Sequence, residues 1–127
     1  MSGPGIATGL IDQGAHSPDQ LIAGEFPRIN RLVTVTGDAL LPAGSVLGRE
    51  SATGLYVLSD SRATDGSEIP DVILAEPVDV TESNAQAYAW FTGEFNATAL
   101  TMGAGHTIDS IAQAFRQRSL FLRHIQP

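Results

Sequence analysis

Histidine is the side chain most suited to acid–base chemistry near neutral pH, and this sequence contains His16, His106 and His124. No two of them stand four residues apart, so the histidine pair of a helical zinc-protease site is missing. His106 precedes a helix-like segment. Asp109 and Glu94 are the carboxylates that could act together with His106. One hypothesis is therefore a small β-barrel enzyme that uses His106 and a nearby carboxylate. The competing interpretation is that His106 caps the helix or lies at the surface.

The glycines before this segment offer a second possible chemistry. Gly103-Ala104-Gly105 could form an anion-binding turn, because a helix N-terminus presents free N–H groups. The third glycine of the dinucleotide fingerprint is missing, since Ile108 occupies its place. The sequence also lacks a nucleophile elbow, a phosphate-loop lysine and calcium-loop spacing. We therefore expect no catalytic residues, no metal and no cofactor, and favour a plain turn before the helix.

Two aromatic side chains could form a ligand platform. Tyr88 and Trp90 are separated by one residue, which places them on the same face of a strand. A ligand- or sugar-binding β module is therefore a further hypothesis. Aromatic residues in such a position more often belong to a core, and this is the interpretation we favour.

Charge and composition limit the class of protein further. The 127 residues contain no cysteine and carry a net charge of −7, which fits one domain without disulfides. Residues 60–94 hold most of the carboxylates and a single arginine, Arg62, so a nucleic-acid partner is not expected. We interpret the acidic stretch as a solvated face rather than a cation site. No apolar run is long enough to span a bilayer and the start does not resemble a signal peptide, so we expect a soluble protein of a cytoplasm-like compartment without a membrane partner.

The elements that would position these side chains are mostly short strands. Alternating or β-branched runs predict strands at 31–36, 45–50, 55–58, 72–75, 78–80, 87–92 and 120–122. The connection at 51–54 ends in glycine and predicts a hairpin, and Gly93 is expected to form a bulge. The fold class expected is mainly β: a small β-rich, clip- or barrel-like domain.

One short helix near residues 107–118 completes the domain. Thr107 is a favourable N-cap, and Asp109 lies in the first turn, where the helix dipole favours an anion. Ile108, Ile111 and Phe115 are spaced to form one apolar stripe.

The N-terminal segment differs from the rest of the chain. Residues 1–24 are rich in glycine and proline, and their apolar residues follow neither a strand nor a helix period. Such a segment buries too little apolar area to offset the entropy of ordering it. We therefore expect a flexible arm over residues 1–24 and a β-rich domain over residues 25–127.

A series of short segments suggests a family. In order, they are AGEFPR at 23–28, AGSVLGR at 43–49, TGLYVLSD at 53–60, ATDGS at 63–67, GEFN at 93–96 and LTMGAGHT at 100–107. This ordered series resembles the head decoration proteins of tailed bacteriophages, the lambda protein D family. The resemblance extends from about residue 23 to about residue 123, and it is the order of the segments that makes it specific.

The resemblance implies a virion protein that is not an enzyme. Members of the family form homotrimers on the outside of the expanded capsid at three-fold sites, where they cement the major capsid protein against the pressure of packaged DNA. The expected locations are the outer capsid surface and, during assembly, the host cytoplasm. The N-terminal arm would become ordered on the shell by pairing with a strand of the capsid protein.

Candidate contact residues follow from position in the chain. At the junction of arm and domain, the candidates for capsid binding are Leu21, Ile22, Glu25, Phe26, Pro27 and Arg28. The candidates for the trimer interface are the apolar residues of the C-terminal segment, Ile108, Ile111, Phe115, Leu120 and Leu122, for which packing inside one subunit is the alternative.

Overall fold

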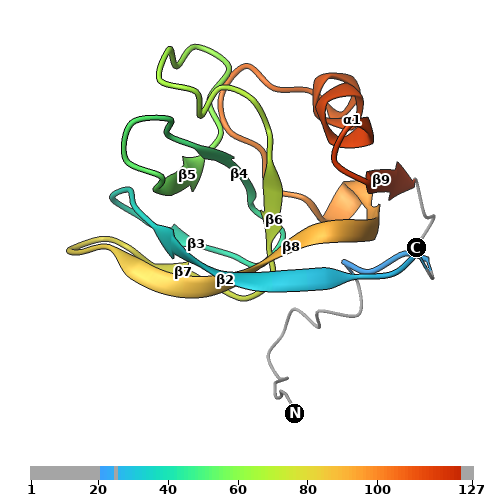
Figure 1. The fold of residues 1–127 in the computed structure, drawn as a ribbon, viewed down its shortest axis with the longest axis horizontal. Coiled ribbons are helices and arrows are strands. Elements are labelled where there is room, and N and C mark those ends of the chain that lie inside the picture. Colours follow the sequence, from blue (N-terminus) through green and yellow to red (C-terminus); the bar gives the residue numbers. More distant parts are fainter. Residues whose placement is uncertain (1–20, 25, 124–127) are drawn as a thin grey trace.

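The computed structural model describes residues 21–24 and 26–123, and these form a mainly β domain with one short α-helix (Figure 1). The elements in chain order are β2 (Ile29–Val35), β3 (Leu40–Leu41), β4 (Val46–Arg49), β5 (Tyr56–Leu58), β6 (Val72–Leu74), β7 (Val78–Asp79), β8 (Ala85–Asn96), the 3-10 helix η3 (Ala97–Ala99), α1 (Ile108–Arg116) and β9 (Leu120–Arg123). The expected fold class is confirmed.

Five strands close into a barrel. Their order is β2-β5-β4-β6-β8, and β8 returns to pair with β2. The β2–β8 pairing is long and antiparallel, whereas β2 meets β5 only at the parallel pair Val35–Tyr56. The closure beside β5 is therefore confined to the end of β2. A separate two-stranded sheet joins β3 to β7.

The first core cluster contains residues from all five strands of the barrel. Val33 and Val35 of β2 belong to it, together with Ala87 and Ala89 of β8, because alternate residues of a strand point to the same face. The cluster also includes Leu47, Val72 and Leu74 from β4 and β6, Tyr56 from β5, and Leu41, Val78 and Val80 from the β3–β7 region.

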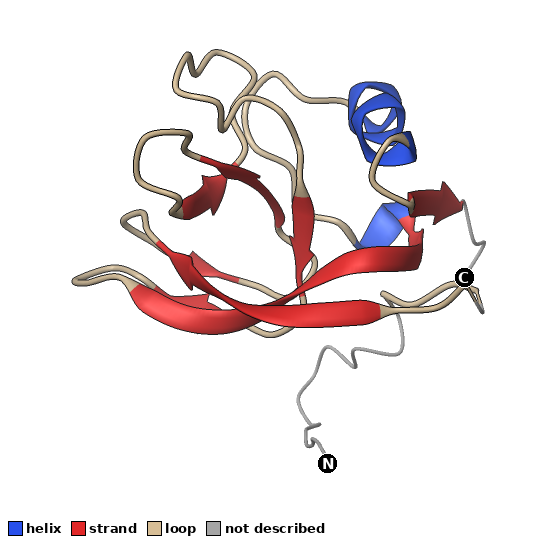
Figure 2. Ribbon diagram, viewed as in Figure 1, coloured by secondary structure: helices blue, strands red, loops and turns tan. Residues whose placement is uncertain are grey.

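A second core cluster lies on the opposite face of the same strands. Val46 and Ile73 are sequence neighbours of first-cluster residues and therefore point the other way. Ile111 and Phe115 of α1 cover them, and both are fully buried. Figure 2 shows the two helical segments on the side of the molecule where β9 lies. The short strands β4 and β6 are thus buried on both faces.

The helix begins and ends close to its expected bounds. Thr107 is the N-cap, and its side chain accepts a hydrogen bond from the backbone N–H of Ser110 at 3.1 Å. The Ser110 hydroxyl accepts in return from the Thr107 N–H at 3.0 Å, which completes a capping box. Asp109 lies in the first turn and Arg116 in the last turn, as the helix dipole favours.

The bulge in β8 lies two residues before its expected position. Thr92 pairs with Ile29 and Trp90 with Asn30, so Phe91 is the extra residue. Gly93 instead has a φ of 143° where β8 begins to pair with β9. The expectation of a bulge at Gly93 is therefore wrong: the glycine allows a backbone conformation at the change of partner, where a Cβ would lie 2.7 Å from the Phe95 ring.

Residues 21–24 lie against the domain, although the sequence placed them in the arm. The Ala23 N–H donates to the Glu94 carbonyl at 3.1 Å, and the Asn96 N–H donates to the Leu21 carbonyl at 2.6 Å. These bonds continue along β8 the antiparallel pairing that β2 makes further on, with Ile22 opposite Phe95. The rest of the expected arm, residues 1–20, lies outside the described residues, and its flexibility stays a prediction.

Candidate interaction surface

The turn between residue 24 and β2 is held at the surface by side-chain contacts. Thr92 of β8 donates its hydroxyl proton to the Pro27 carbonyl at 2.7 Å and accepts from the Ile29 N–H at 3.1 Å. Arg28 donates to the Gly24 carbonyl at 3.3 Å. The Thr92 hydroxyl thus replaces backbone hydrogen bonds between β8 and the chain before β2. Residues 26–28 of the turn remain exposed.

Three of the expected capsid-binding residues form an exposed surface. Phe26 is 37% exposed and packs edge-on against Phe121 of β9, with ring centroids 5.0 Å apart. Arg28 lies over the Trp90 ring at 6.0 Å, and Pro27 between them is exposed as well. A side chain available to a second protein is therefore present at each of these positions.

The other expected capsid-binding residues are placed differently. Leu21 is 4% exposed and belongs to the second core cluster, so it has little surface to offer a partner. Ile22 is half-buried against the same cluster. Glu25 lies outside the described residues. Leu21 is therefore a core residue of the domain, and the capsid-binding role expected of these residues stays a prediction.

Most of the expected trimer-interface residues are also core residues. Ile111, Phe115 and Leu120 are fully buried within one subunit, which is the alternative that the sequence left open. Ile108 and Leu122 are half-buried. The apolar periodicity of the C-terminal segment is thus explained by packing against the barrel.

Sequence reasoning missed several exposed apolar side chains. Ile29 and Leu32 of β2 are 51% and 50% exposed, and Phe121 is exposed between the two buried or half-buried leucines of β9. The exposure of Phe121 could have been predicted from the sequence, because strand alternation directs the middle residue of Leu120-Phe121-Leu122 away from the core.

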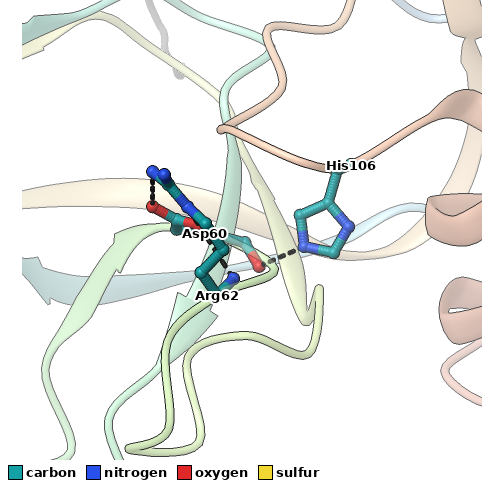
Figure 3. Close-up of polar contacts among 4 residues, drawn as sticks. Asp60, Arg62 and His106 are labelled. Carbon is teal, nitrogen blue, oxygen red and sulfur yellow. Dashed lines mark hydrogen bonds and ion pairs between the residues drawn. The ribbon is translucent and has the colours of Figure 1, made fainter.

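His106 connects the loop before β6 to the start of α1. Its Nε2 lies 3.1 Å from the Ser59 hydroxyl and 3.0 Å from the Glu68 carbonyl, and its Nδ1 lies 3.1 Å from the Ser110 hydroxyl. Figure 3 shows the ring directed toward the turn that carries Asp60 and Arg62. These contacts are typical of a side chain that holds loops together.

The carboxylates around this turn have other partners. Arg62 pairs with Asp60 at 3.0 Å, and its hydrogen bonds lower the pKa of the Asp60 carboxyl (Figure 3). Neither Asp109 nor Glu94 is among the hydrogen-bond partners of His106 within residues 21–24 and 26–123. The proposed pairing of His106 with either carboxylate is therefore not supported by a contact. Nor does that part of the chain contain a group of three metal-ligating side chains.

Tyr88 and Trp90 of β8 differ in exposure. Trp90 is half-buried in the second core cluster, where its ring is tilted against Phe95 with centroids 6.1 Å apart. Tyr88 is 47% exposed on the outer face of β8. The core interpretation therefore holds for Trp90, whereas Tyr88 is a surface residue.

The whole-chain comparison decides the family. A family model described as bacteriophage lambda head decoration protein D matches residues 10–121. The chain belongs to the lambda head decoration protein D family. No curated protein matches the sequence. The resemblance read from the ordered segments is thus confirmed.

Membership of the decoration family changes what counts as the functional site. A head decoration protein is a structural component of a phage capsid, so its function is sought on the surfaces that it presents to other proteins. In this member the exposed surface formed by Phe26, Pro27, Arg28 and Phe121 is the candidate site. No helix of residues 21–24 and 26–123 is long and apolar enough to cross a membrane.

Proposed function

We propose that this head decoration protein binds as a homotrimer to the outside of the expanded phage head at three-fold sites, and that it stabilises the shell against the pressure of packaged DNA. Its partner in the shell is the major capsid protein. It acts in the virion after assembly in the host cytoplasm, and it catalyses no reaction. The observation that carries this proposal is the family match over residues 10–121.

Features of the chain support a role on the outer surface. A trimer would carry a charge of −21, three times the −7 of one chain, and would be repelled by packaged DNA. The exposed turn at residues 26–28 follows directly after the segment that lies on β8. An arm over residues 1–20 that binds the shell would bring the residues that follow it in the chain, including this turn, close to the shell as well.

Several arms on one particle strengthen attachment without requiring tight binding by each arm. Once one subunit is attached, the remaining arms are held near their sites at a high effective concentration. Backbone pairing with a capsid strand would require few particular side chains, which suits a segment rich in glycine.

Deletion of the arm tests this proposal. The deletion should end at residue 20, because Leu21 is a core residue and its removal would destabilise the domain. We expect the chain lacking residues 2–20 to keep its thermal unfolding temperature and its trimeric mass in light scattering, but to lose binding to expanded shells in co-sedimentation.

Two results would contradict the proposal. Full-length protein that leaves expanded shells undecorated, or a truncated chain that occupies them fully, would remove respectively the decorating role or the role of the arm. Unexpanded shells serve as the control, and we expect them to bind neither chain.

A further inference from the structure

Among the residues that the structure describes, no strand lies along most of one side of β2. β8 pairs with β2 from residue 29 to residue 35, whereas β5 meets it only at Val35. Within the part of the chain that the structure describes, nothing pairs with the opposite edge of residues 29–33. Here we call this the β2 edge. In Figure 1 β2 extends well past β5 toward the side on which β9 lies.

The pairing register shows which backbone groups point out of this edge. Tyr88 lies opposite Leu32, yet its carbonyl accepts from the Ala75 N–H at 2.8 Å and its N–H donates to Glu76 at 2.9 Å. Tyr88 therefore directs both backbone groups away from β2. Opposed residues of an antiparallel pair either bond to each other or both point away. Leu32 thus presents its N–H and C=O at the β2 edge, and so does Asn30, two residues earlier.

The exposure of the side chains matches this open edge. All residues from Phe26 to Leu32 are exposed, and Ile29 and Leu32 are about half exposed although they are large and apolar. An exposed edge that carries apolar side chains is a template for pairing with another strand. The edge is therefore suited to β-augmentation, in which main-chain bonds supply affinity and side chains supply specificity.

The charge beside the edge indicates the chemistry of the occupant. Residues 26–36 contain Arg28 and Arg31 and no carboxylate, in a chain whose net charge is −7. The guanidinium carbon of Arg31 lies 5.5 Å from the centroid of the Phe91 ring. None of the ion pairs between described residues involves Arg28 or Arg31. An extended segment with carboxylates would neutralise them.

The same charges disfavour a second copy of the chain as the occupant. Two copies joined edge to edge through β2 would bring Arg28 and Arg31 of both chains together, and like charges in close contact weaken pairing. Residues 1–20 of the chain itself are assigned to a capsid strand by the proposed function, so the arm is not the occupant inferred for this edge. We infer that the β2 edge receives an extended acidic strand of the phage capsid protein, an inference that rests on the proposed decorating function.

A proline substitution blocks the edge selectively. Leu32→Pro removes the outward N–H of Leu32 but none of the bonds between β2 and β8, because proline is tolerated in a strand where its missing N–H would face solvent. Leu32→Ala is the matched control, since it removes the same side chain and keeps the N–H. We expect Leu32→Pro to bind expanded shells of the cognate phage at least tenfold more weakly than Leu32→Ala in co-sedimentation.

A charge reversal tests the chemistry of the occupant. Arg31→Glu should weaken shell binding more than tenfold, with a loss that shrinks as salt is raised. Arg116→Glu is the control, because Arg116 is exposed on α1 and outside the ion pairs between described residues. Equal affinity of the two charge variants would overturn the acidic assignment.

Hydrogen exchange provides a readout that needs no variant. In the free protein the Leu32 amide should exchange at least tenfold faster than the Arg31 and Val33 amides, which bond to β8. On expanded shells the Leu32 amide should become as protected as its neighbours. If Leu32→Pro fails to fold, hydrogen exchange alone tests the inference. A Leu32 amide that stays unprotected on decorated shells overturns it.

The remaining outcomes separate the two proposals. Full decoration by the Leu32→Pro variant leaves the decorating function standing and overturns only the role of the edge. A loss of trimeric mass confined to Leu32→Pro would assign the edge to a second copy, and Leu32 protection in free protein that disappears on deleting residues 2–20 would assign it to the arm. Each of these two results also overturns the inference. Wild-type protein that does not decorate shells overturns both proposals.

Discussion

Buried serine hydroxyls organise the loop between β5 and β6. Ser59 is fully buried and donates to the Ser67 carbonyl at 2.7 Å, while His106 contacts the same hydroxyl. Ser67 is 2% exposed and donates its own hydroxyl proton to Asp65 at 2.5 Å. An unpaired buried hydroxyl would be costly, so these bonds select one conformation of a loop that has little apolar area.

The Ser67 hydroxyl also affects the ionisation of Asp65. Its hydrogen bond, followed by the bond from the Ser67 N–H, lowers the pKa of the Asp65 carboxyl below its ordinary value of 3.8. A carboxyl whose pKa is lowered by folding stabilises the native state above the unfolded pKa and loses this effect as the pH falls through the folded pKa. We expect Ser67→Ala to raise the pKa of Asp65 toward 3.8, measured by NMR titration of the carboxyl carbon.

The stability difference between Ser67→Ala and wild type should accordingly be constant above about pH 5 and should shrink as the pH falls below 3.8. Thr81→Ala is the matched control, since Thr81 lowers the pKa of Asp79 in the same way. It should raise the pKa of Asp79 and leave that of Asp65 unchanged. An unaltered Asp65 titration in Ser67→Ala would refute the assigned cause.

Among the elements, α1 depends on a local capping interaction as well as on packing. Thr107→Ala removes the acceptor for the Ser110 N–H, and we expect it to lower the free energy of unfolding by about 0.5–2 kcal/mol in urea denaturation. Gln113→Ala, at an exposed position of the same helix, should change it by less than about 0.5 kcal/mol. Equal effects of the two variants would mean that the cap contributes nothing measurable.

Elements defined by local signals were predictable from the sequence. The Thr107 cap and the spacing of Ile111 and Phe115 located α1, and the glycine-containing connection at 51–54 located the β4–β5 hairpin. Both signals depend on residues close together in the chain, where periodicity and turn chemistry act directly.

Elements defined by distant partners were not predictable in the same way. Ile22 lies opposite Phe95, and no pattern within residues 21–24 reports a partner so far along the chain. The apolar runs of β4 and β6 indicated burial, but a strand buried on both faces shows no alternation that tells which residues face which core. The sequence could name the candidate contact turn at 26–28, whereas the open β2 edge required the register of three strands.

At the scale of the whole molecule, two core clusters share the same strands. Leu47 belongs to the cluster within the barrel and its neighbour Val46 to the cluster under α1, and Ile73 is likewise flanked by Val72 and Leu74. Separating α1 and β9 from the barrel would therefore expose one complete face of β4 and β6. The two clusters should lose their structure together rather than in succession.

We therefore expect one unfolding transition, which substitution in either cluster shifts. Leu47→Ala should cost about 2–5 kcal/mol and Phe115→Ala about 3–5 kcal/mol, because each leaves a cavity among fully buried side chains. Trp90 fluorescence reports on the cluster under α1, and far-ultraviolet circular dichroism reports on the whole sheet. The two signals should coincide in urea for wild type and for both variants, at one fixed protein concentration. Fluorescence that changes at lower urea than circular dichroism in Phe115→Ala alone would show that α1 and its cluster unfold as a separate unit, and that the barrel does not depend on them.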